Sequence, residues 1–242
     1  AAPHAHTHTP MLDHLTALDR HMLLALNGSG SLFLDALMWT LTQTLTWAPL
    51  LAGIVYVLLR NRRPAVCATV ILAAVLLVAF TDQFSSSLCK PLFHRLRPTR
   101  EPGLGALVDV VHGYRGGMYG FISSHAANTF GAAMFFTLVF RHAPTGVLLF
   151  LWAALSSYTR LYLGVHYPLD ILCGALFGTL SGALFWLVCH RVCRSRLPRC
   201  DYGTARHTAS GYMRSTLPAI FLMASVSLSY ALVRAVVTAS WL

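Results

Sequence analysis

The feature that most constrains this chain is a series of six long apolar segments, at about 35–60, 65–84, 124–141, 145–162, 169–190 and 217–237. Each approaches the length of about 20 mostly apolar residues that a helix needs to cross the hydrocarbon core of a bilayer. Only 11% of the 242 residues are charged, whereas a soluble domain carries about 25%. The sequence therefore predicts an all-α fold in which six transmembrane helices form a bundle.

The first segment is the least regular of the six. Asp35, Gln43 and several threonines reduce its apolar character, and Pro49 interrupts it. We expect its first half to lie in the membrane interface or to line a cavity.

The first 30 residues differ in character from the rest. Residues 11–26 have leucines near helical spacing on one side and Asp, His and Arg on the other, which predicts an amphipathic helix on the membrane surface. The first ten residues alternate His with Ala or Thr, and we expect them to be disordered and not a signal peptide. This gives two expected parts: residues 1–30, a tail plus interfacial helix, and residues 31–242, an integral-membrane domain.

Basic residues orient the predicted bundle. Arginines gather in the loops 60–63 and 191–214 and at Arg141, and the positive-inside rule makes these loops cytoplasmic. The loops 85–123 and 160–168 and both termini then face outward. A second basic cluster lies on that outer side, for which interfacial anchoring is the alternative explanation; its members are Lys90, Arg95, Arg97, Arg100 and Arg115.

Six cysteines suggest neither a disulfide framework nor a metal site. Cys67 and Cys173 fall within predicted spans. Cys189, Cys193 and Cys200, with His207, match no usual zinc spacing. We expect no metal and no cofactor.

Three polar stretches share the predicted outer face. In KPLFHRLRP (90–98), Lys90 and Arg97 lie about two helical turns apart, so on a helix they share a face and can attract an anion. In FISSHAANTF (121–130), a serine at a helix N-cap leaves backbone N–H groups able to bind phosphate, with His125 in the first turn. The alternative for 90–98 is an ordinary basic helix at the membrane interface. The alternative for 121–130 is a capping serine beside an interfacial histidine.

The third stretch is TRLYLGVHYPLD (159–170). Arg160 ends the fourth predicted span, and His166 lies four residues before Asp170, close enough for the carboxylate to hold one ring nitrogen. A local structural cap is the alternative. Because charge at membrane level is unfavourable, the clustering of these groups argues for function. Together they can hold a phosphate and perform acid and nucleophilic catalysis on it.

The pattern K-x6-R-P, then S-x-H, then R-x5-H-x3-D resembles the three-part signature of the type 2 phosphatidic acid phosphatase (PAP2) family of integral-membrane lipid phosphatases. The resemblance implies that His166 attacks phosphorus to form a phosphohistidine, that Asp170 orients it, and that His125 protonates the leaving oxygen. It also implies that no metal is needed and that the phosphate oxygens are held by Lys90, Arg97, Ser123, the backbone N–H of Ser124, and Arg160.

Three positions depart from the commonest pattern of that family, PSGH and SRxxxxxHxxxD. Ile122 replaces Pro, Ser124 replaces Gly and Thr159 replaces Ser. The hydroxyl of Ser124 either adds a hydrogen bond to phosphate or narrows its approach, so this position is the one expected to affect substrate preference.

The expected substrate is an amphiphile whose phosphate lies at the outer, periplasmic face of a bacterial inner membrane. Residues 103–120 are Gly-rich and form a candidate lid with Tyr114, Arg115 and Tyr119. A short lid and a small bundle favour undecaprenyl pyrophosphate. The alternatives are lipid A, as a 1- or 4′-phosphatase, and phosphatidylglycerol phosphate or phosphatidate.

Other functional classes remain to be compared with this one. A lipid phosphotransferase would pass the phosphoryl group to another lipid, and a vanadium haloperoxidase-like enzyme would bind vanadate in the same site. A transporter or lipid-binding protein would be expected to lack one of the two histidines or Asp170, and all three are present. The expected partners are a lipid phosphate and the bilayer, with no nucleic acid.

Overall fold

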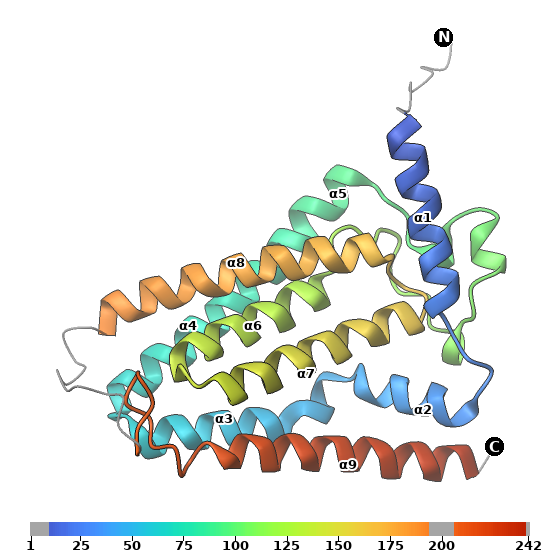
Figure 1. Ribbon diagram of the computed structural model, residues 1–242. Helices are drawn as coiled ribbons and strands as arrows, with labels where there is room; N and C mark the ends of the chain where they lie inside the picture. Colours follow the sequence, from blue (N-terminus) through green and yellow to red (C-terminus); the bar gives the residue numbers. More distant parts are fainter. Residues whose placement is uncertain (1–9, 194–205, 241–242) are drawn as a thin grey trace.

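The structure is a computed structural model that describes residues 10–193 and 206–240 (Figure 1). These residues form helices and loops, with two isolated β-bridges. The main helices are α1 (Pro10–Leu26), α2 (Leu32–Leu41), α3 (Ala48–Asn61), α4 (Pro64–Gln83), α5 (Lys90–Phe93), α6 (Ser124–Phe140), α7 (Ala143–Tyr162), α8 (Pro168–Cys193) and α9 (Pro218–Ser240). Short 3-10 turns lie at Thr44–Trp47, Pro98–Arg100, Leu104–Ala106 and Val111–Gly113, and a π-helical turn spans Phe84–Cys89.

Four helical segments are long and apolar enough to cross a membrane: Thr44–Asn61, Pro64–Phe93, Pro168–Cys193 and Pro218–Ser240. The expectation of six spans is met on these grounds for four of them. Helix α6 has only 17 residues, and the 20 residues of α7 include buried serines and Arg160. Helix α6 packs inside the bundle and has no exposed residue, whereas α7 buries its polar residues on one face and exposes Val147 and Leu151 on another.

The outer surface of α8 shows the opposite pattern. Leu172, Leu176, Leu180 and Leu184 repeat at every fourth position, so they share one face, and each is between 55% and 66% exposed. A leucine stripe of this kind, on a helix long enough to span, is suited to hydrocarbon and not to water.

The inner surface of α8 packs closely on α6 through glycines. A Cβ added to Gly178 would lie 2.2 Å from the carbonyl oxygen of Ala127, and one added to Gly182 would lie 2.3 Å from that of Gly131. Small residues four apart let two membrane helices approach at backbone distance. This packing fixes the start of α6 beside the start of α8, where two of the three polar stretches begin.

The irregular first segment is divided in the structure. Helix α2 ends at Leu41, and α3 begins at Ala48 with Pro49 in its first turn, where a proline needs no hydrogen-bond donor. The first segment is thus interrupted, but at Thr42 and Gln43 and not at Pro49, which lies in the first turn of the helix that follows.

The bundle has two distinct ends (Figure 1). The turns from α3 to α4 and from α6 to α7, the end of α8 and the start of α9 lie at one end. The starts of α6 and α8, the end of α7 and the loop after α5 lie at the other, and α1 lies across that end. The 60–63 turn, Arg141 and the described ends of the 191–214 loop are therefore on the end opposite the three polar stretches, as the sequence predicts; residues 194–205 lie outside the described part of the chain.

Candidate active site

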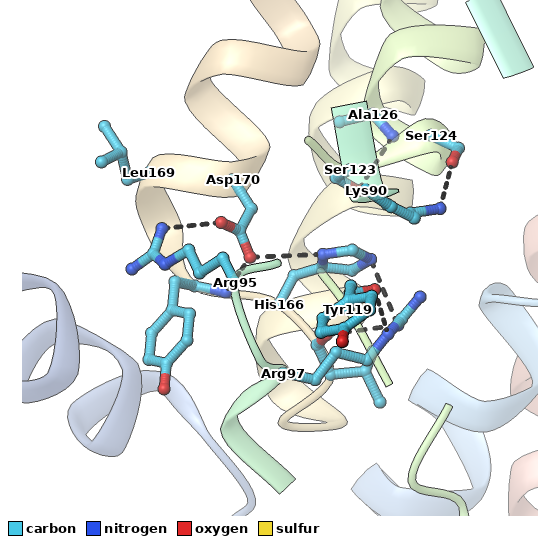
Figure 2. A network of polar contacts seen from close by, with 12 residues as sticks. Lys90, Arg95, Arg97, Tyr119, Ser123, Ser124, Ala126, His166, Leu169 and Asp170 are labelled. Carbon is cyan, nitrogen blue, oxygen red and sulfur yellow. Dashed lines mark hydrogen bonds and ion pairs between the residues drawn. The ribbon is translucent and has the colours of Figure 1, made fainter. Parts of the chain in front are cut away.

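The three polar stretches meet at the end of the bundle crossed by α1 (Figure 2). His166 lies near the centre of the cluster. Arg97 approaches one side of its ring and Asp170 the other, while Lys90 and Ser124 form a separate contact nearby. Residues from all three stretches thus gather around one imidazole.

Lys90 and Arg97 do not share a helix, so this prediction was wrong. Helix α5 ends at Phe93, and His94 adopts a left-handed conformation with φ 47°. Arg97 is extended, as expected for a residue followed by Pro98, because the proline ring disfavours a helical residue before it. The backbone N–H of Arg97 instead donates to the carbonyl of Met118, 3.0 Å away.

Both cations nevertheless reach the site. The Nζ of Lys90 donates to the hydroxyl of Ser124 at 2.7 Å. Arg97 is buried, donating through Nε to the carbonyl of Tyr119 at 3.1 Å and through Nη1 to that of Val165 at 3.2 Å. These two carbonyls fix the guanidinium plane, and Nη1 lies 3.3 Å from Nε2 of His166.

Arg160, the third cation, ends α7 and is buried. Its Nη1 donates to the hydroxyl of Thr42 at 2.7 Å, and its Nη2 donates to the hydroxyl of Tyr114 at 3.2 Å. Its Nε is buried and makes no hydrogen bond with the described residues. Thr42 belongs to the segment between α2 and α3, so the weakly apolar half of the first segment does contribute to this cluster.

Helix α6 begins with the SSH triplet. Ser123 is fully buried, and its hydroxyl accepts from the N–H of Ala126 at 3.4 Å as an N-cap. Its own N–H donates to the carbonyl of Asp170 at 3.1 Å, which ties α6 to α8. Ser124 and His125 follow in the first turn and are half-buried.

His166 and Asp170 pair as their spacing predicts. The Nδ1 of His166 lies 3.5 Å from Oδ2 of Asp170, within ion-pair distance but without hydrogen-bond geometry. The same Oδ2 accepts from the N–H of Tyr167 at 3.0 Å. Both side chains are buried, so the carboxylate faces the ring in a site that excludes water.

Burial lowers the pKa of His166 well below its ordinary value. The charges of Arg97, Arg160 and Lys90 lower this pKa further, and His125 acts in the same direction. His166 is therefore neutral at pH 7, and a neutral imidazole has a lone pair available for nucleophilic attack.

Two residues that the sequence did not single out complete the carboxylate side. Arg95 donates through Nη1 to Oδ1 of Asp170 at 2.7 Å and through Nη2 to Asp19 of α1. Its guanidinium also lies over the ring of Tyr167, 4.2 Å from the centroid. The only sequence signal for Arg95 is its place in the outer basic cluster, and for Asp19 its place on the polar side of an amphipathic helix.

The candidate lid residues have different surroundings. Tyr114 reaches Arg160, as described, and its ring packs edge-on against Trp39 of α2. Arg115 points elsewhere, donating to the carbonyl of Thr99 at 3.1 Å. Tyr119 contributes its carbonyl to Arg97, while its ring packs on His94.

The charges in this cluster are unevenly paired. Within the described part of the chain, Lys90, Arg97 and Arg160 form no ion pair with a carboxylate, whereas Arg95 forms two. Three buried or half-buried cations without counterions favour an anion of high charge beside Nε2 of His166. No group of three His, Cys, Asp or Glu side chains among the described residues is placed to hold a metal ion; Cys200 lies outside those residues.

Comparisons with known proteins agree with this chemistry. A family model described as the PAP2 superfamily matches residues 65–192. The chain is 42% identical over 183 residues to a lipid A 4′-phosphatase of Bacteroides thetaiotaomicron, in an alignment covering 75% of this chain and 81% of that protein. It is 35% identical over 178 residues to a lipid A 4′-phosphatase of Porphyromonas gingivalis, covering 73% and 75% of the two chains.

One solved structure is also similar, the crystal structure of Aquifex aeolicus LpxE. It matches with a TM-score of 0.36 and 23% sequence identity, over 74% of this chain and 87% of that chain.

Proposed function

The chain belongs to the PAP2 superfamily and is a membrane lipid phosphatase, and from this premise we propose that it hydrolyses the 4′-phosphate of lipid A through a phosphohistidine on His166. The observation that supports this reaction most directly is that three cations, without a carboxylate partner among the described residues, lie beside Nε2 of a buried histidine. Such a site attracts a phosphate and offers it a nucleophile at the same point.

In the proposed reaction, Nε2 of His166 attacks phosphorus and the bond from phosphorus to the lipid oxygen breaks. His125 gives that oxygen a proton. Lys90, Arg97 and Arg160 stabilise the charge on the equatorial oxygens, together with Ser123, the N–H of Ser124 and the positive end of α6.

In the second half, water attacks the phosphohistidine. His125, now neutral, takes a proton from that water, and inorganic phosphate leaves as the bond to Nε2 breaks. Asp170 balances the positive charge that His166 carries while its Nε2 is phosphorylated. No step needs a metal.

The choice of lipid A rests on the two relatives of 42% and 35% identity, both named lipid A 4′-phosphatases. Undecaprenyl pyrophosphate, the substrate expected from the short lid and small bundle, has no comparable support. Of the three candidate lid residues, Tyr114 alone contacts a site cation through its side chain, so the lid gives little reason to prefer a slim pyrophosphate lipid.

For the membrane we propose six crossings, made by α2 with α3 and by α4, α6, α7, α8 and α9. Their arginine-rich ends would face the cytoplasm, and the site would face the periplasm of a bacterial inner membrane. Residues 1–30 would form a separate part in which α1 lies along the outer interface, and residues 31–242 the integral-membrane domain.

The test is a phosphate-release assay on purified protein in detergent, with EDTA present. The panel contains lipid A 1,4′-bisphosphate, undecaprenyl pyrophosphate, phosphatidylglycerol phosphate and phosphatidate. Mass spectrometry should show lipid A losing its 4′-phosphate fastest, and His166→Ala should release no phosphate. Preferred hydrolysis of another lipid would overturn the proposed substrate. Phosphate release by His166→Ala, or loss of wild-type activity in EDTA, would overturn the proposed mechanism.

A further inference from the structure

We propose that Arg95 and Asp19 are positioning residues for the reaction, through which helix α1 holds the Asp170 carboxylate against His166. The proposal rests on the proposed function, because it assumes that His166 carries the phosphoryl group. Neither residue touches the space beside Nε2 where phosphate would bind, so both act through Asp170.

The contacts form one chain from the protein surface to the imidazole. Asp19, a buried residue of α1, accepts from the N–H of Leu169 at 2.9 Å and from Nη2 of Arg95. Arg95 then donates to Oδ1 of Asp170, whose other oxygen faces Nδ1 of His166 (Figure 2). Each group is thus oriented by the one before it.

Arg95 determines which oxygen of Asp170 is available to His166. The carboxylate has two oxygens, and Arg95 occupies Oδ1 while the N–H of Tyr167 binds Oδ2 from the backbone. Without Arg95, the carboxylate could rotate about its Cβ–Cγ bond, and its alignment with Nδ1 would be lost. A displacement of about 1 Å at a catalytic group can reduce the rate about 100-fold.

Asp19 has a separate purpose in this arrangement. Arg95 alone would place a full positive charge beside Asp170 and weaken its attraction for the positive ring of a phosphorylated His166. With Asp19 on its other side, the same guanidinium is shared between two carboxylates, so Asp170 keeps more of its own negative charge for the ring. The planar fork of arginine suits this bridging, and a lysine cannot reproduce both contacts in the same geometry.

Among the described residues, two ion-pair links join α1 to the rest of the protein near the site, and only the one through Asp19 and Arg95 ends in a side-chain contact with Asp170. Arg20, the next residue, also joins α1 to the loop after α5 through an ion pair with Glu101, and Glu101 accepts from the hydroxyl of Tyr167. Neither Arg20 nor Glu101 contacts Asp170, and this link reaches the carboxylate only through Tyr167, whose backbone N–H binds Oδ2. Arg20 therefore provides a matched control: it anchors the same helix without touching the carboxylate.

The experiment measures kcat and KM of Asp19→Asn, Arg95→Gln, Arg95→Lys and Arg20→Gln on whichever lipid phosphate the wild type hydrolyses fastest. Arg95→Gln should lower kcat about 100-fold and Asp19→Asn about tenfold, with KM little changed, because substrate contacts are intact. Arg95→Lys should recover part of the loss. Arg20→Gln should stay within about twofold of wild type, as expected for an exposed ion pair.

The double variant Asp19→Asn/Arg95→Gln provides the sharpest result. If the two residues act in series, it should be no slower than Arg95→Gln alone, because no guanidinium is left for Asp19 to orient and the amide oxygen introduced by Asp19→Asn can still accept from the N–H of Leu169. Equal losses in Asp19→Asn and Arg20→Gln, a raised KM with unchanged kcat, or additive effects in the double variant would each overturn the proposal. If Arg95→Gln does not fold, the proposal is tested by comparing kcat of Asp19→Asn with kcat of Arg20→Gln.

This outcome is separate from that of the proposed function. A different preferred lipid would change the substrate and leave the Asp19 and Arg95 comparison intact. Activity in His166→Ala would instead remove the nucleophile that the positioning argument assumes.

Discussion

The two sides of the His166 ring are built in opposite ways. At Nδ1, Asp170 is held by Arg95 and the N–H of Tyr167, and Arg95 is held in turn by Asp19. At Nε2, Arg97 is fixed by two backbone carbonyls, while Arg160 retains a buried Nε without a partner among the described residues. On the Nδ1 side each charged group has a partner of opposite charge, whereas the Nε2 side has an excess of positive charge.

The difference separates orientation from binding. A paired network of charges is rigid and changes little when a ligand arrives, so it can hold a nucleophile in one direction. An excess of unpaired cations is unfavourable without an anion and becomes favourable with one. The Nδ1 side should therefore control kcat, and the Nε2 side should control both binding and kcat.

The largest effect should come from breaking the Nδ1 side at its centre. Asp170→Asn removes the charge that balances the phosphorylated ring, and we expect kcat to fall about 10⁴-fold, comparable to loss of the carboxylate in a Ser-His-Asp triad. KM should change little. Stopped-flow or quench measurements of phosphohistidine formation would check it; a variant that loses binding and keeps its rate of phosphorylation would contradict the comparison.

On the Nε2 side, Arg97→Lys is the corresponding change. Lysine keeps the charge but loses the fork that binds two carbonyls and faces Nε2, so we expect kcat/KM to fall about 100-fold with contributions from both constants. Inhibition by inorganic phosphate should weaken in parallel. An effect confined to kcat would show that Arg97 orients the ring and does not bind phosphate.

The sequence anticipated the groups on the Nε2 side better than those on the Nδ1 side. Lys90, Arg97, Ser123 and Arg160 belong to short patterns whose order and spacing are visible in one chain. Arg95 meets Asp170 and Asp19 across 75 and 76 residues, and that meeting depends on how α1 crosses the end of the bundle. No local pattern encodes such a crossing.

The same limit applies to the fold. Apolar length predicted helices at each of the six segments, but the break in the first lies at Thr42 and Gln43 and not at Pro49, where it was expected. It did not predict that α5 would stop at Phe93, because the turn at His94 depends on backbone pairing of Arg97 with Met118. Nor did it predict that glycines would bring α6 against α8, since Gly178 is understood only from its distance to Ala127.

A smaller effect should appear in the pH dependence of the intact enzyme. Since burial and the cations of the Nε2 side lower the pKa of His166, the reactive neutral ring persists below pH of about 6.5, the ordinary value. The loss of activity that protonation of His166 causes should therefore begin only at lower pH. We expect kcat/KM to fall by clearly less than about fivefold between pH 6.5 and 5.5, the drop that a histidine of ordinary pKa would give.

Arg97→Gln tests the origin of that shift. Removal of a positive charge beside Nε2 raises the pKa of His166, so the acid limb of kcat/KM should move to higher pH even though the overall rate is low. An acid limb that stays at the ordinary histidine value in the wild type would mean that the two sides do not differ as described.

The smallest effect concerns Ser124, which stands where the PAP2 pattern commonly has glycine. Its hydroxyl accepts from Lys90, and the hydroxyl of Ser86 lies 3.3 Å from Ser124 and 3.4 Å from Lys90. Lys90 is thus held by hydroxyl groups of adjustable orientation, as Arg160 is by Thr42 and Tyr114, and it can transfer its hydrogen bond to a phosphate oxygen. Ser124 serves the binding side of the ring and has no contact with Asp170.

Ser124→Gly should therefore raise KM about fivefold and leave kcat within about twofold, because one hydrogen bond to a charged group contributes about 1 kcal/mol. Ser86→Ala is the matched control, since it removes a weaker contact with Lys90 outside α6 and should change KM less. The two variants should be compared on lipid A and on undecaprenyl pyrophosphate. A KM that rises for one lipid alone would make Ser124 a determinant of substrate choice, and a fall in KM for both would mean that the hydroxyl narrows the approach of phosphate.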